Sequence, residues 1–430
     1  MSKKILSHFA PLLVALIILG LIFCWPSKKT IEKPKVWQQA STSMASNVFG
    51  GMAIKNPAIA SGEYVPFFGS SELSRLSPFH PSVLAEKYHR SYRPFLLGAP
   101  GTQSLSQFAI SNSLSKELTN KKAVFIISPQ WFTKKGMEDL EFNAYFSELE
   151  LYHWLLSIDQ VRDSDRYYAR RLLGFSRIKD NAKMSAILSE IANGSNQLSR
   201  KQRHYLEYNY QLLQKEDHLF TQIGMLSKEK KINYFAKKLP SEYNYQTLDS
   251  LAEKIGQKHT NNNRFEIDNV FYKSRLEFGL KELKNSQRKW NYCQSPEYAD
   301  FQLVLNQFAQ SHTQVLFIIP PVNQKWSDYT GLSQEMLQRF AKKIKYQLQS
   351  QGFTDIADFS KDANVRFFMA DTIHLGWRGW LRADEAIAPF LAQPYQPTNY
   401  HLNNAQFFSK KWQNQENIGK RPITRCISSF

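Results

Sequence analysis

The chain has 430 residues, of which 42% are hydrophobic and 14% aromatic. This composition excludes an intrinsically disordered protein, and the length allows a large core. The formal net charge is +18, with lysines and arginines spread in short groups rather than in one long basic tail. The charge therefore indicates either solvated helix faces or a surface that attracts a polyanion, such as nucleic acid, anionic lipid or a phosphate-rich polymer.

The cysteines are few: Cys24, Cys293 and Cys426. They do not make the disulfide framework of a small secreted domain, and whether Cys293 and Cys426 pair is left open. The sequence has no cysteine-rich metal motif, phosphate loop or Rossmann glycine fingerprint. We therefore expect no metal and no cofactor.

An apolar run from Ile5 to Trp25 is the clearest physical signal near the N-terminus. About 20 apolar residues can cross the ~30 Å hydrocarbon core of a membrane as one helix. A cleaved signal peptide is the alternative, but the residues that follow Ile22 are bulky and offer no small-x-small cleavage site. We predict an uncleaved transmembrane anchor over residues 1–26 and a polar stalk over residues 27–60. Lysines flank the run on both sides, so charge alone leaves its orientation open.

From Glu63 onward, apolar runs of strand length alternate with helical runs. The predicted strands are Tyr64–Phe68, Tyr92–Leu97, Ala123–Ile127, Val315–Ile319 and Phe353–Phe359. The predicted helices between and after them are Leu105–Leu118, Glu297–Ala309, Ser333–Gln349 and Leu381–Leu391. Strands that are apolar throughout, alternating with helices, predict an α/β fold with a parallel sheet buried between helices.

Residues 137–298 interrupt this alternation with long helical runs and few strand signals. We predict that they form a helical insertion outside the sheet. The α/β domain then comprises residues 61–136 and 299–391, and residues 392–430 form a polar, aromatic C-terminal tail.

Residues suited to catalysis follow the predicted strands. Ser70 follows the first strand at a Gly-Ser bend, Gly101 follows the second, and Gln130 follows the third. Because sites in parallel sheets lie beyond the carboxyl ends of the strands, we expect these residues at one edge of the sheet. Taken alone, a Gly-Ser bend is more often an ordinary turn or helix cap.

Asp371 and His374 form an Asp-x-x-His pair just before the last helix. Such a turn can place the carboxylate against one imidazole nitrogen and leave the other free to take a proton from a serine. The pair alone would more often be a structural cap. Combined with Ser70 on an α/β chain, it predicts a Ser…Asp-x-x-His catalytic triad.

This order of motifs resembles the SGNH, or GDSL-like, hydrolase superfamily, whose fold is a three-layer αβα sandwich. The likeness is more specific to the DltD family of D-alanyl-lipoteichoic acid biosynthesis in Gram-positive bacteria, and it extends over about residues 5 to 400. Besides the single N-terminal span, four motifs carry it: Phe-Gly-Ser-Ser-Glu-Leu at 68–73, Gly-Thr-Gln-Ser-Leu at 101–105, Ser-Pro-Gln-Trp-Phe at 128–132, and Asp-x-x-His-Leu-Gly-Trp-x-Gly-Trp at 371–380.

The resemblance implies a role for each matching residue. Ser70 would be the nucleophile, His374 the general base and Asp371 the group that orients it. The amides of Ser70 and Gly101 would face the oxyanion. The superfamily has an asparagine in the third block where this chain offers Gln130, which departs from the pattern.

The resemblance also implies an activity and partners. We expect D-alanine esterification of lipoteichoic acid outside the cell membrane, together with a membrane-bound O-acyltransferase and a D-alanyl carrier protein, and no nucleic-acid partner. This expectation settles the orientation of the anchor with the catalytic domain outside. Two alternatives remain: an O-acetyl esterase or transferase acting on another wall polysaccharide, and a non-enzymatic scaffold that recruits the carrier protein.

Overall fold

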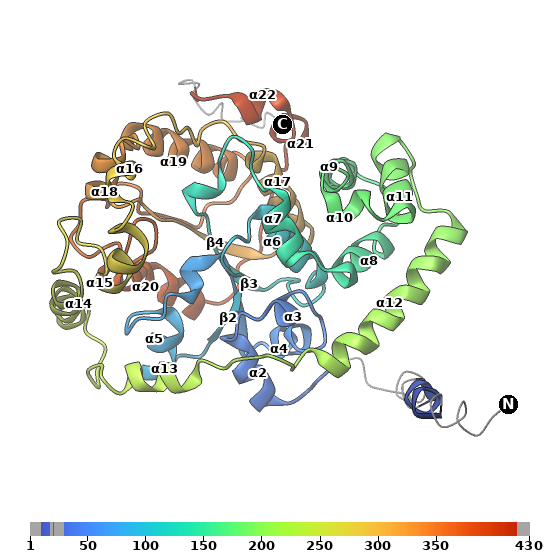
Figure 1. Ribbon diagram of the computed structural model, residues 1–430, viewed down its shortest axis with the longest axis horizontal. Helices are drawn as coiled ribbons and strands as arrows, with labels where there is room; N and C mark the ends of the chain where they lie inside the picture. The colour runs from blue at the N-terminus through green and yellow to red at the C-terminus, as the bar shows by residue number, and fades with distance from the viewer. Residues whose placement is uncertain (1–9, 18–19, 21–29, 419–430) are drawn as a thin grey trace, which may run out of the picture.

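A five-stranded parallel sheet lies at the centre of the molecule (Figure 1). The computed structural model describes residues 10–17, 20 and 30–418, and its strand order is β2-β1-β3-β4-β5. The strands are β1 (Tyr64–Phe68), β2 (Arg93–Leu97), β3 (Lys122–Ile126), β4 (Gln314–Ile319) and β5 (Ile356–Asp358). All neighbouring strands pair in parallel, so the predicted α/β class is confirmed.

The side chains of the strands alternate between two separate cores. Phe68 and Phe125 belong to one core, whereas Phe67, Val124 and Ile126 belong to the other. Successive strand residues point to opposite faces of a sheet, and both faces here are covered by helices. This double burial explains why the strands are apolar throughout.

Helices of the α/β framework cover both faces of the sheet. The first core contains side chains of α6 (Ser104–Ser113), α17 (Glu297–Gln310) and α19 (Gln334–Gln349). The second contains side chains of α5 (Pro81–Lys87) and α20 (Trp377–Ala392). The molecule is therefore layered helix–sheet–helix.

The segment predicted as a helical insertion contributes no strand to the sheet within the described residues 137–298. Its helices α8–α12 form a lobe to the right in Figure 1, whereas α13–α16 lie to the left. These helices are α7 (Asp139–Tyr145), α8 (Glu148–Leu156), α9 (Asp163–Leu172), α10 (Ser176–Lys179), α11 (Ala182–Asn193), α12 (Arg200–Phe220), α13 (Glu229–Ala236), α14 (Tyr245–His259), α15 (Asn269–Phe271), the π-helical turn η3 (Tyr272–Leu276) and α16 (Leu280–Leu283). Leu248, Ala252 and Gly256 of α14 are buried at every fourth position, which is the pattern of a helix that packs by one face.

The described part of the predicted stalk is packed into the body. Residues 34–60 form α2 (Pro34–Ser41), α3 (Ser46–Phe49) and α4 (Lys55–Ala60). Phe49, Ile54 and Ile59 are buried in the first core, and the fully buried Lys55 pairs with Glu150 at 3.0 Å. The stalk prediction is thereby corrected for residues 30–60. These helices are too short to show a clear apolar period.

Most of the predicted transmembrane span lies outside the described residues. Residues 10–17 are helical. Among the residues that the structure describes, no helix is long and apolar enough to cross a membrane. Cys24 and Cys426 also lie outside the described part, and Cys293 is a buried free thiol.

The described part of the C-terminal tail, up to residue 418, ends in two short helices that pack against the body. These are α21 (Asn404–Phe407) and α22 (Lys410–Asn414). Phe407 and Trp412 are buried in the first core. The Lys343 amine of α19 donates hydrogen bonds to the carbonyls of Trp412 (2.6 Å) and Gln415 (2.8 Å), so a buried lysine ties the tail to the framework.

Candidate active site

A serine, a histidine and an aspartate are linked by hydrogen bonds beyond the carboxyl end of β1. Ser71 Oγ lies 2.7 Å from Nε2 of His374. Nδ1 of the same ring lies 2.8 Å from both carboxylate oxygens of Asp371. This is the order of contacts that lets an imidazole take a proton from a hydroxyl while a carboxylate fixes its tautomer.

The hydroxyl that meets the histidine is that of Ser71, one residue beyond the predicted Ser70. Ser71 begins the 3-10 helix η1 (Ser71–Ser74), and its side chain is only partly buried. Ser70 is 2% exposed; its Oγ donates to Glu72 Oε2 at 2.9 Å and accepts from Trp131 Nε1 at 3.3 Å. The expectation that Ser70 faces His374 is therefore corrected to Ser71, because the bend turns Ser70 inward.

Glu72, a residue whose role was not predicted from the sequence, holds the bend. One of its carboxylate oxygens accepts the Ser70 amide at 2.6 Å. The other accepts the hydroxyls of Ser70 and of Ser128, the latter at 3.3 Å. Glu72 is 3% exposed, so these donors compensate for a buried charge. The sequence feature that could have predicted this role is the acidic residue directly after the Gly-Ser-Ser bend.

The loop that carries Asp371 and His374 is fixed by its own backbone. Oδ1 of Asp371 accepts the amides of Ile373 (3.0 Å) and His374 (3.1 Å), and the Ala370 amide donates to the His374 carbonyl at 2.8 Å. Both triad side chains of this loop are almost fully buried.

Burial alone would raise the pKa of Asp371. The hydrogen bond and charge of His374, the Ile373 amide and the charge of Arg75 outweigh burial and lower the pKa below its ordinary value. Arg75 Nη2 lies 3.6 Å from Asp371 Oδ2. The aspartate is therefore held as a carboxylate, which is the form that orients the imidazole.

Side chains that follow β2 donate hydrogen bonds to the backbone of the serine bend. Thr102 Oγ1 donates to the Gly69 carbonyl at 2.8 Å, and the Gln107 side chain donates to the same carbonyl. Gly98 has a φ of +159°, and a Cβ on it would lie 2.1 Å from the Gly69 oxygen. Only glycine allows this close approach of the two strand ends.

The two residues predicted to contact an oxyanion are placed less directly. Gly101 has a φ of +97°, and its described surroundings are Glu141 and Tyr145 of α7. Gln130 lies in the 3-10 turn η2 (Pro129–Trp131) beside Trp131, and its Oε1 is buried without a hydrogen-bond partner among the described residues. The described contacts link neither residue to Ser71.

The described part of the chain has no group of three or more His, Cys, Asp or Glu side chains arranged to hold a metal ion. The histidine and aspartate of the site are bonded to each other and to Ser71. Fold and site together define an α/β protein with a Ser–His–Asp constellation at the carboxyl edge of a parallel sheet.

Comparison with known proteins identifies the family. A family model described as DltD protein matches residues 41–392. The chain is 44% identical over 420 residues to Protein DltD of Lacticaseibacillus rhamnosus, covering 97% of this chain and 98% of the relative. It is 30% identical over 384 residues to Protein DltD of Bacillus subtilis (strain 168), covering 89% and 96%. The chain belongs to the DltD family.

Proposed function

We propose that this protein is a membrane-anchored serine acyltransferase that acts in the D-alanine esterification of lipoteichoic acid. The observation that carries the proposal is the 2.7 Å contact between Ser71 Oγ and His374 Nε2, backed by the Asp371 carboxylate on Nδ1. Membership in the DltD family supports D-alanylation of teichoic acid as the pathway.

The constellation supports a two-step transfer. Ser71 Oγ attacks the carbonyl carbon of a D-alanyl donor while His374 Nε2 takes the hydroxyl proton. The donor's leaving group departs with that proton, and a D-alanyl ester remains on Ser71. A hydroxyl of the acceptor then attacks this ester, His374 takes its proton, and the proton returns to Ser71 Oγ as the acceptor ester is released.

Two groups are suited to stabilise the oxyanion in these steps. The Ser71 amide has no hydrogen-bond partner among the described residues, and it lies at the start of η1, where amides point outward. Gln130 Oε1 has no hydrogen-bond partner in the described part of the chain, so this bond does not fix the orientation of the side-chain amide whose Nε2 is the donor. We assign the Ser71 amide as one donor and Gln130 as the second. The predicted Gly101 amide remains a candidate.

The apolar run at Ile5–Trp25 and membership in the family support an anchored arrangement. The N-terminal helix would span the cell membrane once, with the α/β body outside. A membrane-bound O-acyltransferase and a D-alanyl carrier protein would be partners in the pathway, and lipoteichoic acid would be the acceptor.

The proposal is tested in cells that carry the His374→Ala protein as their only copy. We expect the D-alanine ester content of the envelope to fall to that of cells lacking the protein, with membrane levels of the protein unchanged. His401→Ala, at an exposed histidine outside the site, is the matched control and should leave the ester content unchanged. Normal D-alanine ester content with folded His374→Ala protein would favour a scaffold, and loss of acetate esters instead would favour an O-acetyl transferase.

A further inference from the structure

A groove of about 640 Å³ opens beside the triad. Its walls come from four parts of the chain: Ser74–Pro78 after the serine bend, the region of α13 and α14 in the helical insertion, Asp268 and Phe271 at α15, and the loop from Ala370 to Trp377. Asp371 lies in its wall, so the groove adjoins the Ser–His–Asp constellation on the side of the aspartate. Its volume falls within the range of about 300 to 1,000 Å³ typical of ligand sites.

Cations dominate the charge of this groove. Arg75, Lys231, Lys238 and Lys258 line it, against two carboxylates, Asp268 and Asp371. Asp268 already accepts the amides of Val270 and Phe271, and Asp371 is bonded to His374. Within the described residues the three lysines form no ion pair, so their charges are free for a ligand.

Aromatic rings hold several of these cations in place. The Arg75 guanidinium lies 5.2 Å from the ring centre of Phe271, and the Lys231 ammonium lies 5.7 Å from that of Phe235. Lys238 lies 4.0 Å from the ring centre of Tyr234. Contacts of this kind stabilise a cation and limit its motion, so a ligand encounters charges that are already ordered.

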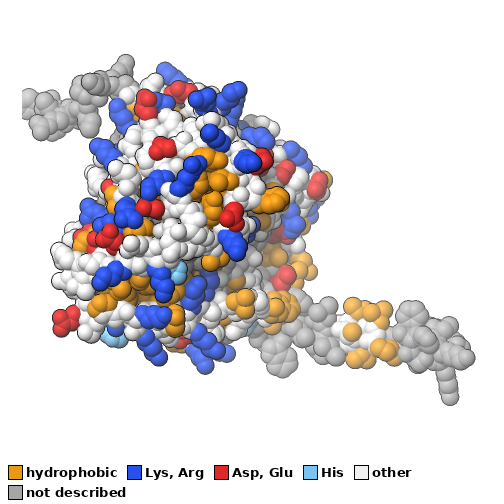
Figure 2. Space-filling model, turned by 60° about the vertical axis from the view of Figure 1, so that its left-hand side comes forward, with side chains coloured by type: hydrophobic (Ala, Val, Ile, Leu, Met, Phe, Trp, Pro, Cys, Tyr) orange, Lys and Arg blue, Asp and Glu red, His pale blue; other side chains and the backbone are white. Residues whose placement is uncertain are grey.

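The floor between the cations is apolar. Leu251, Ile255 and Trp377 contribute to it. Figure 2 shows hydrophobic side chains bordered by lysine and arginine side chains on the face that was to the left in Figure 1, where α13 and α14 lie. A ligand suited to this surface carries repeated negative charges joined by short carbon units.

We infer that this groove binds the acceptor through its phosphodiester groups and guides one hydroxyl of a glycerol-phosphate chain toward the triad. The inference rests on the proposed function, which it deepens. Arg75, Lys231, Lys238 and Lys258 contact successive phosphates, and the apolar floor packs against the carbon units between them. The helical insertion thereby acquires a role, because α13 and α14 build one wall of the acceptor site.

The test measures binding of a soluble glycerol-phosphate oligomer to the full chain in neutral detergent by calorimetry at several salt concentrations. Replacing Lys231, Lys238 and Lys258 together by glutamine should weaken binding by about 10- to 100-fold. It should also reduce the slope of log K against log salt by about 2, since each phosphate contact contributes roughly 0.7 for a single-stranded polyanion. Lys201→Gln, in the first turn of α12 on the other side of the molecule, is the matched control and should change neither value.

Two further binding measurements distinguish acceptor binding in the groove from the proposed chemistry and from lipid binding. Ser71→Ala should bind the oligomer like the unmodified protein, so loss of the proposed chemistry and loss of the groove are distinguishable. Short-chain phosphatidylglycerol should compete weakly, because it offers one phosphate rather than a series. Unchanged oligomer affinity in the triple variant would overturn the inference, as would phosphatidylglycerol binding the groove while the oligomer does not.

Discussion

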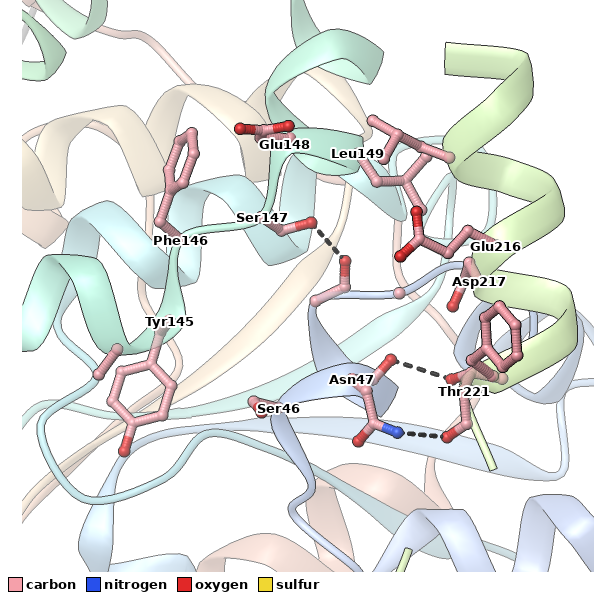
Figure 3. A pocket seen from close by; sticks show the side chains of 15 residues that line it. Ser46, Asn47, Tyr145, Phe146, Ser147, Glu148, Leu149, Glu216, Asp217 and Thr221 are labelled. Carbon is pink, nitrogen blue, oxygen red and sulfur yellow. Dashed lines mark hydrogen bonds between the residues drawn. The ribbon is translucent and has the colours of Figure 1, made fainter. Parts of the chain in front are cut away.

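Two hollows of the molecule differ in the sign and the bonding of the charged side chains that line them. The basic groove beside the triad contains lysines without ion-pair partners among the described residues. The other hollow, of about 340 Å³, lies between α3, the start of α8 and the end of α12, and it is lined by Glu148, Glu216 and Asp217 (Figure 3). Both are open to solvent and mix polar with apolar side chains, so shape alone does not distinguish them.

Several polar groups of this second hollow, called the acidic hollow below, form hydrogen bonds that hold the fold together. Asp217 accepts the amides of Met52 (2.6 Å) and Ala53 (2.8 Å). Asn47 and Thr221 exchange two hydrogen bonds, and Ser147 donates to the Gly50 carbonyl (Figure 3). These bonds fasten the N-terminal helices to the insertion. In this hollow Asp217, the carboxylate that binds two backbone amides, has a structural role, whereas the three lysines of the basic groove have no ion-pair partner among the described residues and lie next to the Ser–His–Asp constellation.

The largest effect should come from removing the proposed nucleophile, Ser71, beside the basic groove. Ser71→Ala should lower D-alanylation by about 10⁴-fold or more, because the covalent route requires its hydroxyl. Ser70→Ala, its matched neighbour, should cost about 1 kcal/mol of stability from lost hydrogen bonds and leave most activity per folded molecule. Ester content and melting temperature are measured for both variants. The reverse ranking would restore Ser70 as the nucleophile.

Asp371→Asn should have the next largest effect. It should lower D-alanylation on the order of 10⁴-fold, because an amide favours the wrong imidazole tautomer. The loss should not add to that of Ser71→Ala, since both residues act through one proton transfer. Turnover of the single and double variants provides the measurement. A double variant about 10⁴-fold worse than Ser71→Ala alone would show that Asp371 acts separately.

In the acidic hollow the expected effect is on stability. Asp217→Ala leaves the amides of Met52 and Ala53 without their acceptor and should cost about 2 to 3 kcal/mol of unfolding free energy. D-alanylation per folded molecule should stay unchanged. Chemical denaturation and an ester assay corrected for folded protein separate the two quantities. A loss of activity beyond the loss of folded protein would make this hollow a site as well.

The smallest effect is expected from Ser147→Ala in the same hollow. Ser147 accepts the Glu150 amide as the cap of α8 and donates to the Gly50 carbonyl at 2.7 Å. Losing a helix cap costs typically about 1 kcal/mol. A fall of a few degrees in melting temperature is expected with normal activity. An unchanged melting temperature would show that this bond contributes nothing to the attachment of the N-terminal helices.

The sheet could be predicted from the sequence because its central strands are apolar on both faces, as at Ala123–Ile127, and alternate with helical runs. Which serine contacts His374 could not be predicted, because two adjacent serines fit the same motif. Only the inward turn of Ser70 onto Glu72 and Trp131 separates them.

Other features depended on contacts between distant residues. The groove is lined by segments near residues 75, 231–259 and 371, so no local sequence pattern predicts it. The helices of residues 34–60 gain their burial by packing on strands β1 and β2 as well as on the insertion, as in the Lys55–Glu150 pair, rather than from their own periodicity.

We propose that Ser71, rather than Ser70, carries the reactive hydroxyl. This proposal is tested most directly by treating the full chain with a serine-reactive fluorophosphonate and locating the adduct by peptide mass spectrometry. We expect the adduct on Ser71, its persistence in Ser70→Ala, and its absence in Ser71→Ala and His374→Ala. An adduct on Ser70, or labelling that survives in Ser71→Ala, would contradict the account.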